Sequence, residues 1–501
     1  MSDLLYTSND WTYDDLERIW DHIDHVARTE YKLDYYPPQM EVVTFNQMIE
    51  AYSNIGLPVN YSHWSFGKSY QETLESYKNG KRGLAYELII NSDPAIAYLL
   101  DTNTSTTMAM VMAHACVGHS TVFKTNYLMS ELSSPKFIVP FCKYAQTRIT
   151  EIESIYGCDV VENLLDTLHT LEQYGIDESR RVNHKESVLK DRDQSRIVDE
   201  QKNFDLIFNK IPKEPQVFDN ELNFEIKKIH NFPEKNILYF LENHSPYFNK
   251  FPELKEICYI VRKIAQYFYP QRKTKLINEG VASFWHYELM NNLYNNNKIS
   301  DGNYLEFIDL HSGVINQPSY KKMIGLNPYK VGFAILQDIK RICIQQNDED
   351  LYYFPYLRGA YWLDVIKEIT VLYRDESFLQ QWLTPRVVKD LKLFMFNYST
   401  NNNFYTITND QSEECFFDLR EQISKYYSNI NSTPIIEIVN YKNHGTTELK
   451  LKHTRYNKRD LTNIDEFIGA LTSLMKCNIS FNIYNDKGKL RNEISYKIER
   501  K

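Results

Sequence analysis

The feature that most constrains the fold of this chain is the spacing of its apolar residues, which recur every three or four positions over long stretches. In the stretch 135–156, five apolar residues would share one face of a helix: Ile138, Phe141, Ala145, Ile149 and Ile152. Glycine and proline, which are frequent in turn-rich β proteins, number only 16 and 17 among 501 residues. The pattern therefore predicts a mainly helical protein.

Two parts of the sequence depart from the helical period. Residues 83–91 (GLAYELIIN) are an apolar run typical of a strand, which Asp93-Pro94 would end. Beyond the polar stretch 401–403, helical and strand-like segments alternate, with helices at 413–427 and 464–475 and strands at 435–440, 448–452 and 477–483. We expect an α+β fold, in which a helical, bundle-like body contains a short β element and is followed by a small C-terminal α/β domain.

These changes of pattern divide the chain into four predicted segments. They are an N-terminal helical part at 1–176, a connector at 177–215, a second helical part at 216–399 packed on the first, and the α/β domain at 403–501. Between Asp177 and Lys202, 14 of 26 residues are charged, seven of each sign. Such a run is typical of a solvated connector or an exposed helix.

The composition excludes several classes of function. Lysine and arginine number 57 against 66 aspartates and glutamates, and the net charge of −9 has the wrong sign for a nucleic-acid partner. No window reaches the ~18 consecutive apolar residues that span a membrane, and the polar start of the chain lacks the core of a signal peptide. Seven scattered cysteines without a Cys-x-x-Cys pair indicate reduced thiols. We expect a cytoplasmic protein without a membrane span.

A nucleotide motif is also missing. Gly67-Lys68-Ser69 looks like the end of a phosphate-binding loop, but the glycine that the loop requires five residues earlier is Ser62.

The first candidate for chemistry is the pair His114 and His119, at the end of an apolar helical segment that begins near Thr106. Histidines that bind one metal ion from a helix are usually four residues apart, whereas five residues turn through about 140° in an α-helix. Gly118 could end or kink the helix and let His119 fold back toward His114. Two interpretations stay open, a metal-binding pair or a core histidine beside an unrelated histidine at a helix end.

The second candidate is the pair Glu279 and His286, which share one face of a predicted helix at 274–294. Their separation along the helix axis is about 10.5 Å, so direct binding of one ion by both would be strained. Glu279 is then the ligand, and His286 is a supporting group or a general acid or base. The alternative is a buried glutamate that is hydrogen-bonded inside a helical bundle. Other polar residues on apolar helices could line the same cavity: Arg148, Glu151, Glu153, His169 and His311.

Several longer motifs together resemble one known family. They are Pro58–Lys68 (PVNYSHWSFGK), Gly83–Pro94 (GLAYELIINSDP), the His114/Gly118-His119 box, Tyr269–Lys275 (YPQRKTK), Asn278–His286 (NEGVASFWH) and Gly325–Phe333 (GLNPYKVGF). The combination resembles the stage V sporulation protein R (SpoVR-like) family from about Leu33 to Phe396, and the C-terminal module with His453, Arg455, Asn457 and Arg459 resembles it too. At Val281 the chain departs from the tryptophan that is usual in the family.

The resemblance implies a cytoplasmic protein associated with formation of the spore cortex peptidoglycan, in a family that also occurs in bacteria that do not sporulate. Some members are encoded beside a serine protein kinase and a von Willebrand factor A-like protein, which suggests a functional link to both. The family implies no defined activity.

The layout also resembles, more loosely, the helical zinc peptidases of the gluzincin type, which combine two histidines from one helix with a glutamate from a later helix. In those peptidases a glutamate follows the first histidine and activates water, whereas this chain has Ala115 there. A hydrolase would need another base, for which Glu151, Glu153 and His286 are the candidates.

Our leading hypothesis is a metal-dependent hydrolase-like site in which His114, His119 and Glu279 bind Zn or Fe, with His169 as an alternative ligand. The substrate would be a peptide or a cell-wall component. The alternatives are a non-haem iron enzyme and a non-catalytic regulatory or scaffold protein, whose buried polar residues form a satisfied network and whose C-terminal domain recruits a partner.

Overall fold

The computed structural model describes residues 4–54, 56–57, 60–79, 87–180, 233–317, 326–393, 396–399, 404–407, 413–430, 436–442, 448–453, 464–484 and 489–497. The chain divides into two compact units, one made of Met1–His169 with Glu253–Thr433 and the other of Thr170–Pro252 with Pro434–Lys501. The predicted segment boundaries stay predictions. Residues 181–215 of the predicted connector lie outside the described residues.

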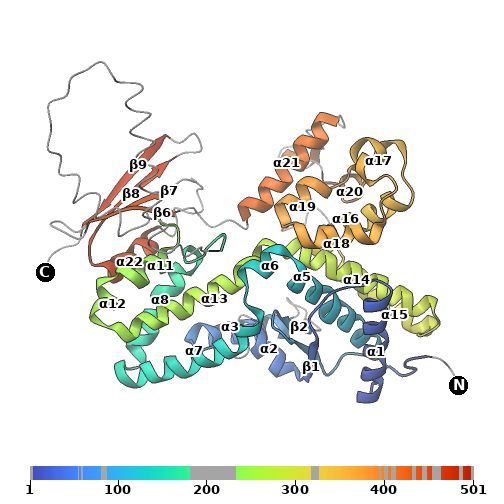
Figure 1. The fold of residues 1–501 in the computed structure, drawn as a ribbon, viewed down its shortest axis with the longest axis horizontal. Coiled ribbons are helices and arrows are strands. Elements are labelled where there is room, and N and C mark those ends of the chain that lie inside the picture. Colours follow the sequence, from blue (N-terminus) through green and yellow to red (C-terminus); the bar gives the residue numbers. More distant parts are fainter. Residues whose placement is uncertain are drawn as a thin grey trace, which may run out of the picture. The chain divides into compact units, whose positions relative to one another are not determined.

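Helices dominate the first unit (Figure 1), as the apolar spacing predicts. Its helices are α1 (Tyr13–Thr29), α2 (Phe45–Ser53), α3 (Trp64–Lys78), α4 (Ser105–Val111), η1 (Met112–His119), α5 (Ser120–Thr125), α6 (Tyr127–Leu132), α7 (Pro135–Tyr156), α8 (Cys158–Leu171, which crosses the unit boundary), α13 (Lys255–Lys273), α14 (Lys275–Asn295), α15 (Asp301–Val314), α16 (Pro328–Ile344), α17 (Asp348–Tyr353), α18 (Trp362–Leu372), α19 (Asp375–Trp382), α20 (Pro385–Asp390) and α21 (Glu413–Ile430).

A small sheet accompanies these helices. Its strands lie in the order β1-β3-β2, with β1 (Pro38–Val43) parallel and β2 (Glu87–Ile90) antiparallel to β3 (Ala95–Leu100). The sequence predicted a strand at 83–91, of which residues 83–86 lie outside the described residues and 87–90 form β2, but it did not predict β1 or β3. A separate two-stranded sheet pairs β4 (Phe396–Ser399) with β5 (Phe404–Ile407).

The core of the first unit is built around α14, which packs against both η1 and α16. Apolar side chains on all sides of α14 are buried, among them Leu276, Val281, Trp285 and Leu289. A helix that is covered all round belongs to the interior. The polar residues that α14 carries, Glu279 and His286, are therefore held in place by packing on both sides.

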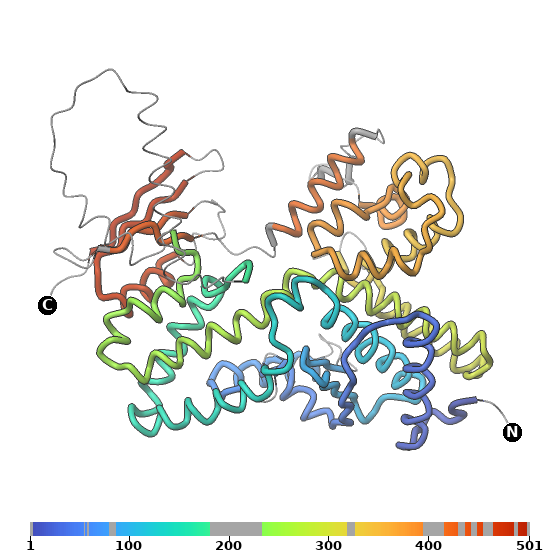
Figure 2. Tube along the Cα trace, in the orientation of Figure 1, coloured from blue at the N-terminus to red at the C-terminus, as the bar shows by residue number. Residues whose placement is uncertain are grey.

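The second unit is the α/β module, whose chain path can be followed in Figure 2. Its four strands are β6 (Ile436–Lys442), β7 (Glu448–His453), β8 (Asn478–Tyr484) and β9 (Leu490–Tyr496), paired in that order. The parallel pair β7 and β8 is connected through α22 (Ile464–Met475), and α11 (Ile237–His244) and α12 (Pro246–Lys250) pack on α22. Together the two units confirm the predicted α+β fold.

No helix among the described residues is both long enough and apolar enough to cross a lipid bilayer.

Candidate metal site

The helix that carries His114 and His119 changes its geometry between them. α4 runs into η1, a π-helix from Met112 to His119, and the chain continues without a break into α5. A π-helix bonds residue i to residue i+5, so side chains five positions apart stand on the same face. The two imidazole rings are thereby brought together, with centroids 4.6 Å apart.

The predicted kink at Gly118 was wrong. Gly118 keeps a helical backbone, and the described glycines with positive φ are Gly56, Gly157 and Gly359. The missing side chain serves a different purpose, because a Cβ atom at Gly118 would lie 2.5 Å from the Cα of Ala282 on α14. Gly118 lets η1 approach α14 closely enough for their polar side chains to meet.

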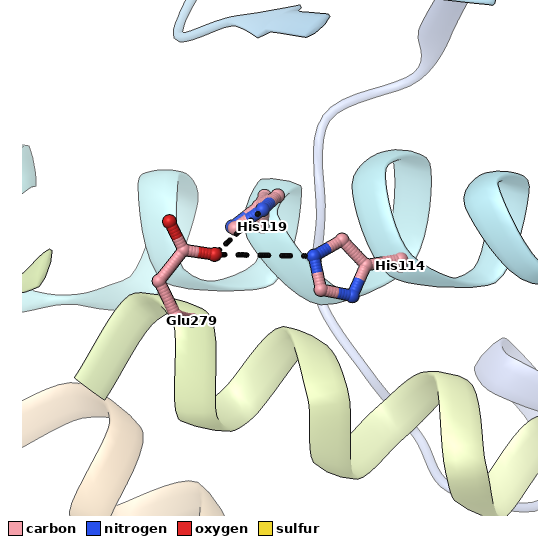
Figure 3. A group of neighbouring side chains, drawn as sticks. All are labelled: His114, His119 and Glu279. Carbon is pink, nitrogen blue, oxygen red and sulfur yellow. Dashed lines mark ion pairs between the residues drawn. The ribbon is translucent and has the colours of Figure 1, made fainter. Parts of the chain in front are cut away.

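Three side chains from η1 and α14 converge on one point (Figure 3). The Nε2 atom of His119 lies 3.5 Å from Oε2 of Glu279, and the Nε2 atom of His114 lies 3.9 Å from the same oxygen. One ligand atom from each residue falls within a group whose members are at most 4.8 Å apart. The structure thus brings together the three residues that the sequence offered as ligands.

The donor atoms of this cluster fit a cation. His119 places Nδ1 3.0 Å from Oδ1 of Asn278, an amide oxygen that accepts the Nδ1 proton and leaves the lone pair of Nε2 facing Glu279. Oε2 of Glu279 is buried and has no hydrogen-bond partner among the described residues. Lone pairs that converge without a proton or a cation between them repel each other, so a bound cation would relieve this arrangement.

A fourth polar residue at the cluster, Glu87, was missed from the sequence. It is the first residue of β2, and its Oε1 atom lies 4.0 Å from Nε2 of His114. Burial raises the pKa of Glu87 to about 8, and the negative charge of Glu279 contributes. An acidic residue inside the apolar run GLAYELIIN was the available signal, because a charge in such a run must be paired or protonated.

Burial also shifts the pKa values of His114 and Glu279, which neighbour Glu87. Burial lowers the pKa of His114 well below its usual value, and the nearby His119, His286 and His311 add to the effect. Burial raises the pKa of Glu279. The charges of His119 and Lys275 and a hydrogen bond from Tyr329 act in the opposite direction. The imidazole of His114 is therefore neutral at pH 7, which is the form that binds metal ions.

Behind the cluster, three histidines form a hydrogen-bonded chain. Nδ1 of His114 lies 2.8 Å from Nδ1 of His286, and Nε2 of His286 lies 2.7 Å from Nδ1 of His311 on α15. His286 is fully buried, and the other two rings are nearly so. The structure therefore places His286 against a candidate ligand, as a supporting group would require.

The remaining candidate residues lie elsewhere. Glu151 is on an exposed part of α7, where it forms an ion pair with Arg148 at 2.8 Å. Glu153 is half-buried two positions further along the same helix. Neither carboxylate belongs to the group of converging ligand atoms. The position of the two glutamates on the helix could be predicted, but not which way they face.

His169 also lies outside the cluster. Its Nε2 atom is 2.6 Å from the hydroxyl of Tyr61, and its ring is 4.6 Å from that of His63 between centroids. Burial lowers the pKa of His169 to about 4, and the neighbouring His63 contributes. His169 is part of the packing between α8 and the segment before α3, and it is not in the group of ligand atoms.

Fold and site together define a mainly helical α+β protein with a largely buried cluster of two histidines and one carboxylate. The chain belongs to the SpoVR-like family, because the family model described as SpoVR like protein matches residues 10–432. Uncharacterized protein YcgB of Escherichia coli strain K12 is 41% identical over 457 residues, which cover 90% of this chain and 88% of that protein. Its name states no activity. No solved structure matches the chain.

Proposed function

We propose that His114, His119 and Glu279 bind one divalent cation, zinc in the first place, and that the site supports hydrolysis. The observation that carries the proposal is the buried, unpartnered Oε2 atom of Glu279, which faces Nε2 of both histidines at 3.5 and 3.9 Å. Three protein ligands with a fourth position left open are typical of catalytic zinc sites.

A zinc ion held there would polarise a carbonyl group and make water more acidic. The chain must also supply a base, because Ala115 stands where the gluzincin peptidases have their glutamate. We assign this role to Glu87, whose carboxyl group lies beside His114 and whose pKa of about 8 suits proton exchange near neutral pH. Glu151 and Glu153 gain no support from their positions, and His286 is better suited to orienting His114.

Two alternatives compete with this proposal. Two histidines and one carboxylate are also the ligand set of non-haem Fe(II) enzymes, so iron could occupy the same position. A non-catalytic scaffold would instead hold the cluster together with protons and use its C-terminal module to recruit a partner. The unpartnered oxygen of Glu279 argues against a fully satisfied network.

Metal analysis of the purified full-length protein tests the proposal. We expect one tightly held ion per chain, with zinc preferred over iron when both are offered under anaerobic conditions. The variants His114→Ala, His119→Ala and Glu279→Gln should lose the ion. His169→Ala, which removes a half-buried histidine outside the cluster, is the matched control and should keep it. Protein without stoichiometric metal under any of these conditions would support the scaffold alternative.

For the substrate we propose an amide, either a peptide or a peptide bond of the cell wall. Support comes from the zinc-like donor set and from the resemblance to proteins associated with cortex peptidoglycan. We also propose the serine protein kinase and the von Willebrand factor A-like protein as functional partners, on the resemblance alone. Release of new amino groups from peptidoglycan fragments, absent in Glu87→Gln and His119→Ala, would test the substrate class.

A further inference from the structure

A second group of polar side chains lies outside the candidate metal site, where α3 and α8 meet. It contains His63 and Ser65, which belong to the motif PVNYSHWSFGK, and the carboxylates of Glu162 and Asp166 on α8. The imidazole of His63 faces a hydroxyl group with one ring nitrogen and two carboxylates with the other. None of these four residues belongs to the group of converging ligand atoms at the metal site.

The Nδ1 atom of His63 is a hydrogen-bond acceptor. It accepts the backbone N–H of Ser65 at 3.3 Å, as the N-cap of α3, and it lies 2.7 Å from Oγ of the same serine. A backbone N–H can only donate, so Nδ1 carries no proton. The hydroxyl of Ser65 therefore donates to Nδ1 as well, which is the contact that a nucleophilic serine makes with its general base.

The opposite ring nitrogen of His63, Nε2, carries the ring proton and faces the carboxylates. It lies 3.2 Å from Oε2 of Glu162 and 3.3 Å from Oδ1 of Asp166. The side chain of His63 is only 1% exposed, and Oε2 of Glu162 is buried with no other hydrogen-bond partner among the described residues. Trp64 donates its Nε1 proton to Oδ1 of Asp166 at 3.0 Å and so holds that carboxylate. Negative charge at this place stabilises the imidazolium that forms when Nδ1 takes up a proton.

Helix capping alone does not explain this arrangement. The cap of α3 uses only Nδ1 of His63 and the backbone N–H of Ser65, and an asparagine would serve the same purpose. The buried contact between Nε2 and two carboxylates of another helix adds nothing to a cap. A hydroxyl, an imidazole and a carboxylate in this order are instead the arrangement of Ser-His-Asp catalysis, with the two ring nitrogens exchanged.

We propose that Ser65 is a nucleophile that accepts an acyl group from an ester, with His63 as its general base. Glu162 and Asp166 are positioning residues that stabilise the protonated ring. The site goes beyond the proposed metal site and does not depend on it.

The reaction needs only the ester and water. Oγ of Ser65 forms a bond to the acyl carbon while its proton moves to Nδ1 of His63. The bond from the acyl carbon to the alcohol oxygen then breaks, and the leaving oxygen takes the proton from Nδ1. Water releases the acyl group as a carboxylic acid through the same two proton transfers, which restores Ser65.

The position of Ser65 limits the kind of ester. Ser65 is the second residue of α3, a helix of 15 residues whose positive N-terminal end favours the negative charge that develops on the reacting oxygen. Ser65 is half-buried and its neighbour Trp64 is 55% exposed, so the hydroxyl lies close to the surface. We expect an activated ester, because it requires less stabilisation of the oxyanion than an amide does.

A fluorophosphonate probe, which bonds covalently to activated serines, tests the proposal on the full-length protein. The reaction is run in EDTA, so that a metal ion does not contribute, and mass spectrometry should find the adduct on Ser65. Ser65→Ala should abolish it, whereas Ser62→Ala, at an exposed serine of the same motif, should retain it.

One substitution separates catalysis from capping. His63→Asn keeps an acceptor that caps α3 but removes the base, and it should slow the labelling of Ser65 about 10²- to 10⁴-fold. Labelling of Ser65 at the wild-type rate in folded His63→Asn would overturn the proposal. Absence of the adduct from the folded wild-type protein would overturn it as well.

Hydrolysis of p-nitrophenyl acetate tests the two carboxylates. The double variant Glu162→Gln/Asp166→Asn keeps the shapes of both side chains and removes their charges. Its kcat should fall about tenfold or more while KM stays the same, because the charges act on the imidazolium and not on the bound ester. Glu151→Gln, at an exposed position on α7, is the control and should leave kcat unchanged. A wild-type kcat in the double variant would overturn the positioning role.

Discussion

Gly280 and Gly332 meet back to back where α14 crosses α16, and a Cβ atom on either one would lie 2.6 Å from the Cα of the other. A Cβ at Gly332 would also approach the carbonyl oxygen of Leu276 to 2.7 Å. Since backbone atoms block both positions, no side-chain rotation can make room. Gly280 immediately follows Glu279, so this contact fixes the backbone from which the candidate ligand projects.

We therefore expect Gly332→Ala to destabilise the protein and disturb the site together. The cost should be at least about 1–3 kcal/mol in the free energy of unfolding, measured by urea denaturation, because the helices must separate. Gly67→Ala is the matched control, since Gly67 is inside α3 and a Cβ there meets nothing within 4 Å. Gly67→Ala should raise the free energy of unfolding slightly, by about 0.4–1 kcal/mol. Equal effects of the two substitutions would contradict the close crossing.

The raised pKa of Glu87 predicts a pH-dependent difference in stability for the metal-free protein. The folded state keeps the carboxyl proton up to about pH 8, whereas the ordinary value is 4.5. Because the folded state binds this proton more tightly, the contribution of Glu87 to stability falls as the pH rises from about 4.5 to 8. Glu87→Gln should therefore gain stability relative to wild type between pH 5 and pH 9.

Urea denaturation in the presence of a chelator measures this difference at the two pH values. Glu151→Gln, at an exposed position on α7, is the control substitution. A stability difference between wild type and Glu87→Gln that is the same at pH 5 and pH 9 would show that Glu87 ionises normally in the folded state.

Asn278 should matter for metal affinity although it is not a candidate ligand. Its amide oxygen holds the Nδ1 proton of His119 at 3.0 Å and so keeps Nε2 free. We expect Asn278→Ala to weaken zinc binding about 10- to 100-fold in chelator competition. Asn278→Asp keeps an acceptor at the same place and should retain more of the affinity. An equal loss of zinc affinity in Asn278→Ala and Asn278→Asp would point to a general packing defect.

The C-terminal module provides a prediction on folding. A fragment of residues 403–501 should fold by itself if the boundary predicted from the sequence is right. In the structure, however, Ser245 donates a hydrogen bond of 2.8 Å to the carbonyl oxygen of Leu474, and α11 and α12 cover α22. We expect addition of a fragment of residues 170–252 to raise the melting temperature of the 403–501 fragment by several degrees, as measured by circular dichroism. An unchanged value would show that the shorter fragment is complete.

The helical architecture was predictable because apolar periodicity is a local property of the sequence. Convergence of His114, His119 and Glu279 was also predictable, but the reason given for it was wrong. The five-residue spacing was attributed to a kink at Gly118, whereas a π-helical turn aligns the two rings. A π-helix has no residue signature that distinguishes it from an α-helix before its neighbours are known.

Contacts between distant elements could not be predicted in the same way. Glu87 joins the cluster because β2 packs on η1, and His311 joins the histidine chain because α15 packs on α14. Neither packing leaves a periodic trace in the sequence. Conversely, Glu151 lies beside Ile152 on an amphipathic helix, and only the observed packing shows that it faces solvent.

The π-helix η1 holds one residue more per turn than the α-helices on either side of it. A chain that lacked one residue between the two histidines would keep a metal pair, since a spacing of four aligns two side chains on an ordinary α-helix. The deletion would turn the π turn into an α turn and leave the residues beyond it on the same faces. Lys124 on α5 would still pair with Asp34, and Val122 would stay in the core. The extra residue of η1 is therefore a local insertion, which changes the spacing of the two histidines without changing the register of the helix that follows.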